Sequence, residues 1–182
     1  MIGDAIHNHM CALDYAWLET LKRFVPSAVS KHTKFPVYPS GGELEAALKG
    51  LKIDTACPKL FTLMVCKIKP YDGGNDAIWF VHKLDILDKH KLLTPVVTFA
   101  AIEGIEVENE RGETARGGTW SAKQAPPYFV PIENGWHIRD KGKVTVDVVF
   151  GRETTAPGFP VSSTLSSYSR HILKVVENLE GL

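Results

Sequence analysis

The stretch IWFVHKLDILDKHKLLTPVVTFAAI, residues 78–102, contains the point at which the chain changes from a helical to an extended pattern. Its first part belongs to a helix that Asn75 is expected to cap, because the apolar residues Ile78, Val81 and Leu84 recur every three or four positions, the spacing of one helix face. After Pro95, the run 96–102 is mostly β-branched and aromatic, as in a buried strand. The stretch therefore predicts that helices precede it and strands follow it.

Three further helices are predicted before this stretch. Residues 2–24 carry an apolar side chain on every turn until Pro26 ends the pattern. A second helix begins at the capping box 40–43, in which Ser40 accepts a hydrogen bond from the Glu43 amide. A third helix contains the apolar residues of 60–68 and ends before a Pro and Gly-rich turn.

The residues after the stretch predict strands and one last helix. Strands are expected at 105–109, 128–132, 136–138 and 144–150, with 105–109 beside 96–102. An amphipathic helix follows Pro160, capped by Ser162 or Ser163. This order predicts an α+β fold: N-terminal helices, an antiparallel β-meander, and a C-terminal helix packed on the sheet.

The whole chain is expected to form a single domain, because no long linker or repeat divides it. Within it we distinguish a mainly helical half at 1–92, a β half at 93–160 and the C-terminal helix at 161–182.

Composition narrows the function classes. The 182 residues include 21 basic and 21 acidic side chains, so the formal net charge is zero and a nucleic-acid partner is disfavoured. The apolar runs are too short to span a membrane, and the start of the chain does not have the basic region of a signal peptide. Three cysteines fit neither a zinc site nor a disulfide framework. These features predict a cytoplasmic protein with reduced thiols.

The first helix carries an unusual polar cluster. His7 and His9 lie two positions apart and so point about 200° apart on a helix, where they cannot share a metal ion. His7, Cys11 and Asp14 share one face, where a carboxylate can orient an imidazole for acid–base chemistry or a histidine can activate a thiol. Two other interpretations stay open: that His7 and Asp14 bridge packed helices, and that Cys11 is an inert core residue.

A second polar cluster ends the fourth helix and consists of Asp85, Asp88, Lys89, His90 and Lys91. Cations at this end suit the helix dipole, so a purely structural role explains the pattern. The functional alternative is that Asp88 and His90 turn inward and meet His7 and Asp14 of the first helix. Polar residues that converge between helices are a common place for a ligand.

The segment 3–15, GDAIHNHMCALDY, together with FPVY at 35–38 and DKHK at 88–91, resembles a family of uncharacterised bacterial proteins. Its members read G-D-x-x-H-N-L-R-S-A-L-D-H in the first helix and D-K-H-R in the later one. The family has no assigned activity. The resemblance implies that one site contains the matching positions His7, Asn8, Asp14, Asp88, Lys89 and His90.

The R-x4-H spacing of that family is similar to the signature of HEPN-type helical ribonucleases. Here Met10 and Tyr15 stand in place of the arginine and histidine, so the groups that would bind phosphate and transfer protons are missing. A ribonuclease is therefore the least favoured function. Family members also carry a segment before G-D, and we expect the surface or sheet edge it would leave here to favour a homodimer.

The leading hypothesis from the sequence is a binding or interaction protein with a polar His/Asp site between helices. The alternative is a hydrolase or phosphodiesterase in which His7 or His90 is the general base and Asp14 or Asp88 orients it. Asn8, Asp88 and Lys89 would then bind the ligand. Residue spacing identifies neither a metal nor a cofactor, and whether the protein is an enzyme stays open.

Overall fold

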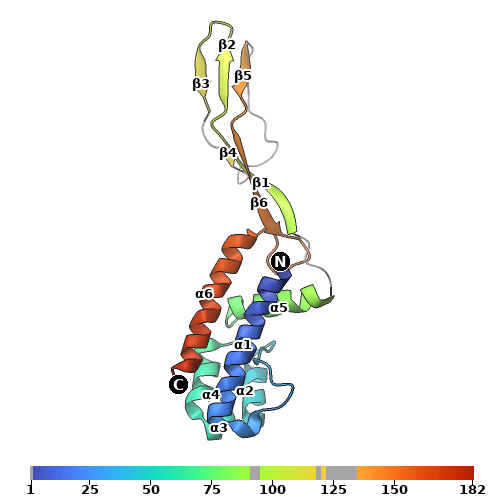
Figure 1. The fold of residues 1–182 in the computed structure, drawn as a ribbon, viewed down its shortest axis with the longest axis vertical. Coiled ribbons are helices and arrows are strands. Elements are labelled where there is room, and N and C mark those ends of the chain that lie inside the picture. Colours follow the sequence, from blue (N-terminus) through green and yellow to red (C-terminus); the bar gives the residue numbers. More distant parts are fainter. Residues whose placement is uncertain (1, 91–94, 118–119, 122–134) are drawn as a thin grey trace. The chain divides into compact units, whose positions relative to one another are not determined.

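The computed structural model describes residues 2–90, 95–117, 120–121 and 135–182 (Figure 1). Contacts between Cα atoms divide the chain into two compact units. Residues 1–94 together with 150–182 form one, and residues 95–149 form the other. Helices lead, antiparallel strands follow and a helix ends the chain, which confirms the predicted α+β class.

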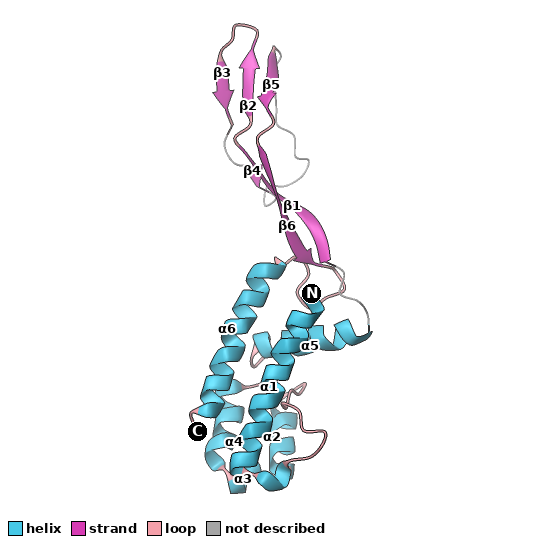
Figure 2. Ribbon diagram, viewed as in Figure 1, coloured by secondary structure: helices cyan, strands magenta, loops and turns pink. Residues whose placement is uncertain are grey.

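The first unit is helical (Figure 2). It consists of α1 (Ile2–Phe24), the 3₁₀ turn η1 (Pro26–Ala28), α2 (Gly41–Gly50), α3 (Ile53–Ala56), α4 (Pro58–Thr62), the π-helical η2 (Leu63–Ile68), α5 (Asp76–His90) and α6 (Val161–Glu180). Helix α1 contacts both α5 and α6, and these two also contact each other. The helices α1, α5 and α6 therefore pack against one another.

The core of the helical unit follows the predicted apolar stripe of α1. Its buried residues include Ile6, Met10, Leu13, Trp17 and Leu21, spaced three or four apart. Helix α6 has a matching buried stripe from Val161 to Leu179. Because the apolar side of each helix is covered by its neighbours, the polar residues of α1 are left on the faces beside that stripe.

Two of the predicted helix caps are confirmed. The Ser40 hydroxyl accepts a hydrogen bond from the Glu43 amide at 3.3 Å, and Asn75 Oδ1 accepts one from the Ile78 amide at 3.2 Å. The predicted cap of α6 is wrong, because extended Pro160 takes that position and its carbonyl accepts from the Thr164 amide. Ser162 and Ser163 lie in the first turn instead.

The strands among the described residues belong to the second unit, apart from Phe150 at the end of the last one: β1 (Pro95–Glu103), β2 (Glu106–Asn109), β3 (Thr114–Arg116), β4 (Trp120–Ser121), β5 (Trp136–Asp140) and β6 (Lys143–Phe150). They form two three-stranded sheets, in the orders β4-β1-β6 and β3-β2-β5. In the second sheet, β2 pairs antiparallel with both of its neighbours. The strand expected at 128–132 lies outside the described residues.

Residues 105–109 were expected beside 96–102, but β1 and β2 lie in different sheets. Two glycines at positive φ, Gly104 and Gly142, separate β1 from β2 and β5 from β6. A Cβ atom on Gly142 would lie 2.3 Å from the carbonyl oxygen of Glu103, so the two breaks face each other. The two backbone segments approach each other closely at these glycines. This explains why the break between β1 and β2 lies opposite the break between β5 and β6.

Candidate functional site

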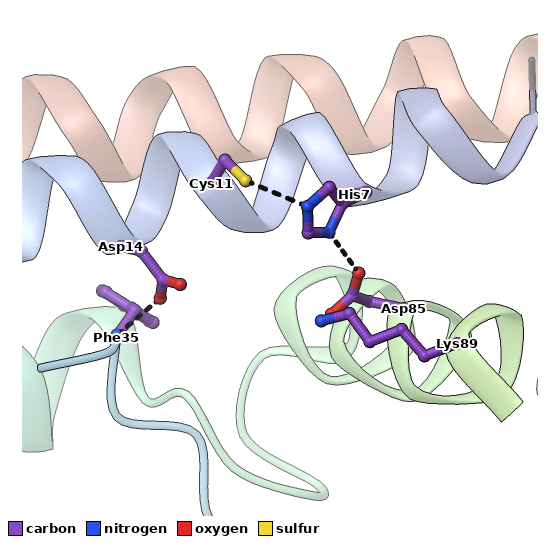
Figure 3. A network of polar contacts seen from close by, with 6 residues as sticks. All are labelled: His7, Cys11, Asp14, Phe35, Asp85 and Lys89. Carbon is purple, nitrogen blue, oxygen red and sulfur yellow. Dashed lines mark hydrogen bonds and ion pairs between the residues drawn. The ribbon is translucent and has the colours of Figure 1, made fainter. Parts of the chain in front are cut away.

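The polar faces of α1 and α5 meet in a line of hydrogen bonds centred on His7 (Figure 3). Its Nδ1 lies 2.9 Å from Asp85 Oδ1, and its Nε2 lies 3.5 Å from the sulfur of Cys11, one turn further along α1. An ionised carboxylate only accepts, so His7 Nδ1 carries the proton in this arrangement. In neutral His7, Nε2 is then left as the acceptor for the thiol.

Asp85 belongs to the inward side of α5, next to the buried residues Val81 and Leu84. Its side chain is 8% exposed, and Lys89, one turn later, donates to the second carboxylate oxygen. Burial raises the pKa of Asp85, but the hydrogen bonds and charges of Lys89 and His7 outweigh this and lower the pKa below its ordinary value. Asp85 is thus ionised at neutral pH.

Asp14 holds the loop that follows the first helix. Its Oδ1 accepts a hydrogen bond of 2.7 Å from the backbone amide of Phe35. The rings of Phe35 and Trp17 are nearly perpendicular, with their centroids 6.1 Å apart. These contacts place residues 34 and 35 beside the polar face of α1. A carboxylate from the first helix therefore builds one wall of the site.

These elements enclose a pocket of about 150 Å³. The lining residues are His7, Met10, Cys11, Asp14, Lys34, Phe35, His82, Asp85, Ile86 and Lys89. The His7 imidazole and the Cys11 thiol therefore share one cavity with a second imidazole, two carboxylates and two ammonium groups. Lys89 is paired with Asp85, whereas Lys34 makes no ion pair within the described part of the chain.

The structure brings together some of the residues expected in one site. His7, Asp14 and Lys89 line the pocket, but Asn8 is exposed on α1 and does not. His90 ends α5, and its side chain lies outside the described residues. The roles predicted for these residues stay predictions.

Asp88 lies against the first turn of α1. A Cβ atom at Gly3 would be 2.1 Å from its Oδ2, so a larger residue there would displace the Asp88 carboxylate from this position. The N-terminal end of a helix attracts a carboxylate, which favours this contact. Gly3 of one motif that carries the family resemblance and Asp88 of the other therefore lie side by side.

Sequence reasoning did not select Asp85, His82 or Lys34 as site residues. Asp85 gave a usable signal, because it lies four residues after Val81 and seven after Ile78, and so interrupts a buried stripe. Aspartate is rarely buried unless it is paired. Lys34 gave none, since the Asp14–Phe35 hydrogen bond that positions its loop joins residues 21 apart.

His9 faces a different neighbour, as the 200° separation predicts. Its Nε2 lies 2.7 Å from the hydroxyl of Ser169 on α6, while Nδ1 is buried without a hydrogen-bond partner among the described residues. Burial lowers the pKa of His9. Within the described residues, no group of three or more His, Cys, Asp or Glu side chains is arranged to hold a metal ion.

The lowered pKa of His9 predicts a dependence of stability on pH. Unfolded His9 titrates near 6.5 and the native residue titrates below that value, so the unfolded state binds more protons in between. The free energy of unfolding should therefore fall as pH decreases below 6.5. Urea denaturation of the wild type and His9→Gln at several pH values measures this contribution. The fall should be shallower in His9→Gln and unchanged in His171→Gln, and equal falls in all three would contradict the assignment.

Comparison with models of known protein families, with curated proteins and with solved structures gives no significant match. The family resemblance thus remains an expectation. No described helix combines the length and apolar character needed to cross a bilayer.

Proposed function

We propose that the helical unit is a hydrolase in which His7 transfers protons and Asp85 orients it. The supporting observation is that one nitrogen of His7 is held by a buried, ionised carboxylate while the other faces a pocket beside a thiol. A base must be fixed in one tautomer and must reach the reacting atoms. The contact with Asp85 supports the first requirement, and the position of His7 Nε2 at the pocket supports the second.

The surroundings of the pair suit a substrate that develops negative charge. Asp85 stabilises the imidazolium that forms when His7 takes up a proton. The ammonium group of Lys34, which forms no ion pair with a described residue, supplies a positive charge at the same pocket, where it can stabilise an oxyanion. A volume of about 150 Å³ is below that of a pocket for a whole drug-sized ligand, so we expect only the reacting group to enter.

Turnover of small ester and phosphodiester substrates by the full chain tests this proposal. We expect the ester substrate, p-nitrophenyl acetate, to be hydrolysed. His7→Ala should lower kcat/KM for this ester by about 10²–10⁴-fold, the usual contribution of a positioned base. His171→Gln on α6, which removes an exposed histidine, is the matched control and should retain activity. Equal rates for the wild type and His7→Ala would reject a catalytic role for His7.

Binding without turnover is the second candidate function. It is favoured by the pairing of Asp85 with two cationic partners, because such a network also forms a rigid recognition surface. Native mass spectrometry of untagged protein distinguishes the two candidates. A retained small molecule that is lost in His7→Ala, without turnover of any substrate tested, supports binding.

We also propose that the protein is cytoplasmic and forms a homodimer. The three cysteines are free, as in a reducing compartment. Strand β6 is an edge of its described sheet, and its side chains Val144, Val146 and Val148 are 44–57% exposed. An apolar edge strand favours pairing with a second copy. The same mass spectra should therefore show a dimer.

A further inference from the structure

The three cysteines of the chain lie in different surroundings. Cys11 and Cys66 are exposed, and Cys57 is half-buried. The Cys11 sulfur lies 3.5 Å from His7 Nε2 and lines the 150 Å³ pocket. Among the described residues, none forms a hydrogen bond with the sulfur of Cys66. Cys66 therefore provides an internal reference for the intrinsic reactivity of an exposed thiol.

The contacts of Cys11 form a continuous chain from the thiol to a buried charge. The thiol faces an imidazole nitrogen, the other imidazole nitrogen faces Asp85, and Lys89 pairs with the second oxygen of Asp85 (Figure 3). A nucleophile, a base and a group that orients the base define an activated nucleophile in unrelated folds. The histidine and the cysteine lie four residues apart on one helix, so the helix itself sets their spacing.

We propose that Cys11 is a covalent nucleophile and that the substrates are small activated acyl compounds, such as esters or thioesters. This inference rests on the proposed hydrolase function and narrows it to acyl transfer. It assigns to Cys11 the role of attacking group and to His7 that of its proton acceptor. Lys34 lies at the same pocket, where the tetrahedral oxyanion would form.

The reaction proceeds in two steps. The Cys11 thiol loses its proton to His7 Nε2, and its sulfur forms a bond to the acyl carbon. The bond to the leaving alcohol or thiol then breaks, and the leaving group takes the proton from His7. In the second step His7 takes a proton from water, the resulting hydroxide attacks the thioester, and the proton returns to the Cys11 sulfur as the acid leaves. No oxidant, reductant or further reactant is needed.

Alkylation of the full chain by iodoacetamide tests the activation of the thiol. The rates at Cys11 and Cys66 are read from the same sample by peptide mass spectrometry. At pH near 6.5 we expect Cys11 to react at least about tenfold faster than Cys66, because His7 Nε2 can accept the proton of the Cys11 thiol. His7→Gln should abolish the difference, and His171→Gln should preserve it. Equal rates at the two thiols, or a difference that survives His7→Gln, would overturn the proposal.

Acyl transfer is tested with p-nitrophenyl acetate. An acetyl group on the Cys11 peptide, absent in Cys11→Ala and not on Cys66, supports the covalent step. If turnover persists in Cys11→Ala but is lost in His7→Ala, His7 acts directly on water; the proposed hydrolase function then stands and the nucleophile proposal fails. If turnover persists in both variants, both proposals fail. Hydrolysis restricted to the phosphodiester likewise overturns the acyl assignment.

Discussion

Replacing Asp85 by asparagine is expected to lower kcat/KM for the ester substrate by about 10²–10⁴-fold while the chain remains folded. An asparagine side chain has nearly the same shape but carries no charge, and its amide can donate to His7 Nδ1. That donation favours the tautomer whose proton is on Nε2, the nitrogen that must accept from the thiol. The positive charge that forms on His7 also loses its buried counter-charge.

The change in folding free energy for Asp85→Asn should be small by comparison. His7 and Lys89 have side chains 52% and 46% exposed, so both can be solvated by water when the carboxylate is removed. The stabilisation by ionised Asp85 is present above its ordinary pKa and is lost as pH falls through its lowered native pKa. Urea denaturation at neutral pH and at pH near 3 measures this difference.

Asp72→Asn is the matched control, because Asp72 is an exposed carboxylate in the turn before α5. It should leave both turnover and the acid dependence of stability unchanged. If Asp85 has a purely structural role, the loss of turnover in Asp85→Asn should come from unfolding of the chain. Turnover would then follow only the folded fraction, and would be restored at temperatures or urea concentrations where Asp85→Asn is fully folded.

Replacing Trp17 by alanine is expected to lower the free energy of unfolding by about 3–5 kcal/mol. Trp17 is 1% exposed in the inward stripe of α1, and its ring meets the edge of Phe35. Removing the indole leaves a large cavity that the packed helices can fill only in part. A loss of this size is a large fraction of the stability of an ordinary domain.

Urea denaturation followed by circular dichroism measures the effect of Trp17→Ala. Trp17→Phe keeps an aromatic ring at the position and should lose less stability. Leu173→Ala changes a residue that is 58% exposed on α6 and should stay within about 0.5 kcal/mol of the wild type. A loss below about 1 kcal/mol for Trp17→Ala would contradict the packing described for α1.

The parts of this fold that depend on local sequence were predictable. The stripe of α1 follows from its periodicity, and the caps at Ser40 and Asn75 form within three residues. The partner of His7 was not predictable in the same way, because it depends on how α5 is rotated against α1. The end of α5 was expected to supply Asp88 and His90, whereas the hydrogen bond to His7 comes from Asp85, nearly one turn earlier.

The breaks in the strands depend on tertiary structure as well. Gly104 and Gly142 are separated by 38 positions, and only the close approach of one backbone to the other at these points explains both. The loop at Phe35 is similar, since its hydrogen bond to Asp14 appears only after the chain has folded back on α1. Single-sequence patterns record neither contact.

Gly3 has no side chain, and the Asp88 carboxylate of α5 occupies the space beside it on α1. A methyl group there would meet the carboxylate of Asp88, and relieving that overlap requires either a rotation of Asp88 or a wider separation of α1 from α5. His7 lies one helical turn from Gly3, and the atoms that must stay in register with it belong to α5. An alanine at position 3 therefore first displaces the Asp88 carboxylate, and it separates α1 from α5, and so lengthens the His7–Asp85 hydrogen bond, only where that side chain is held in place.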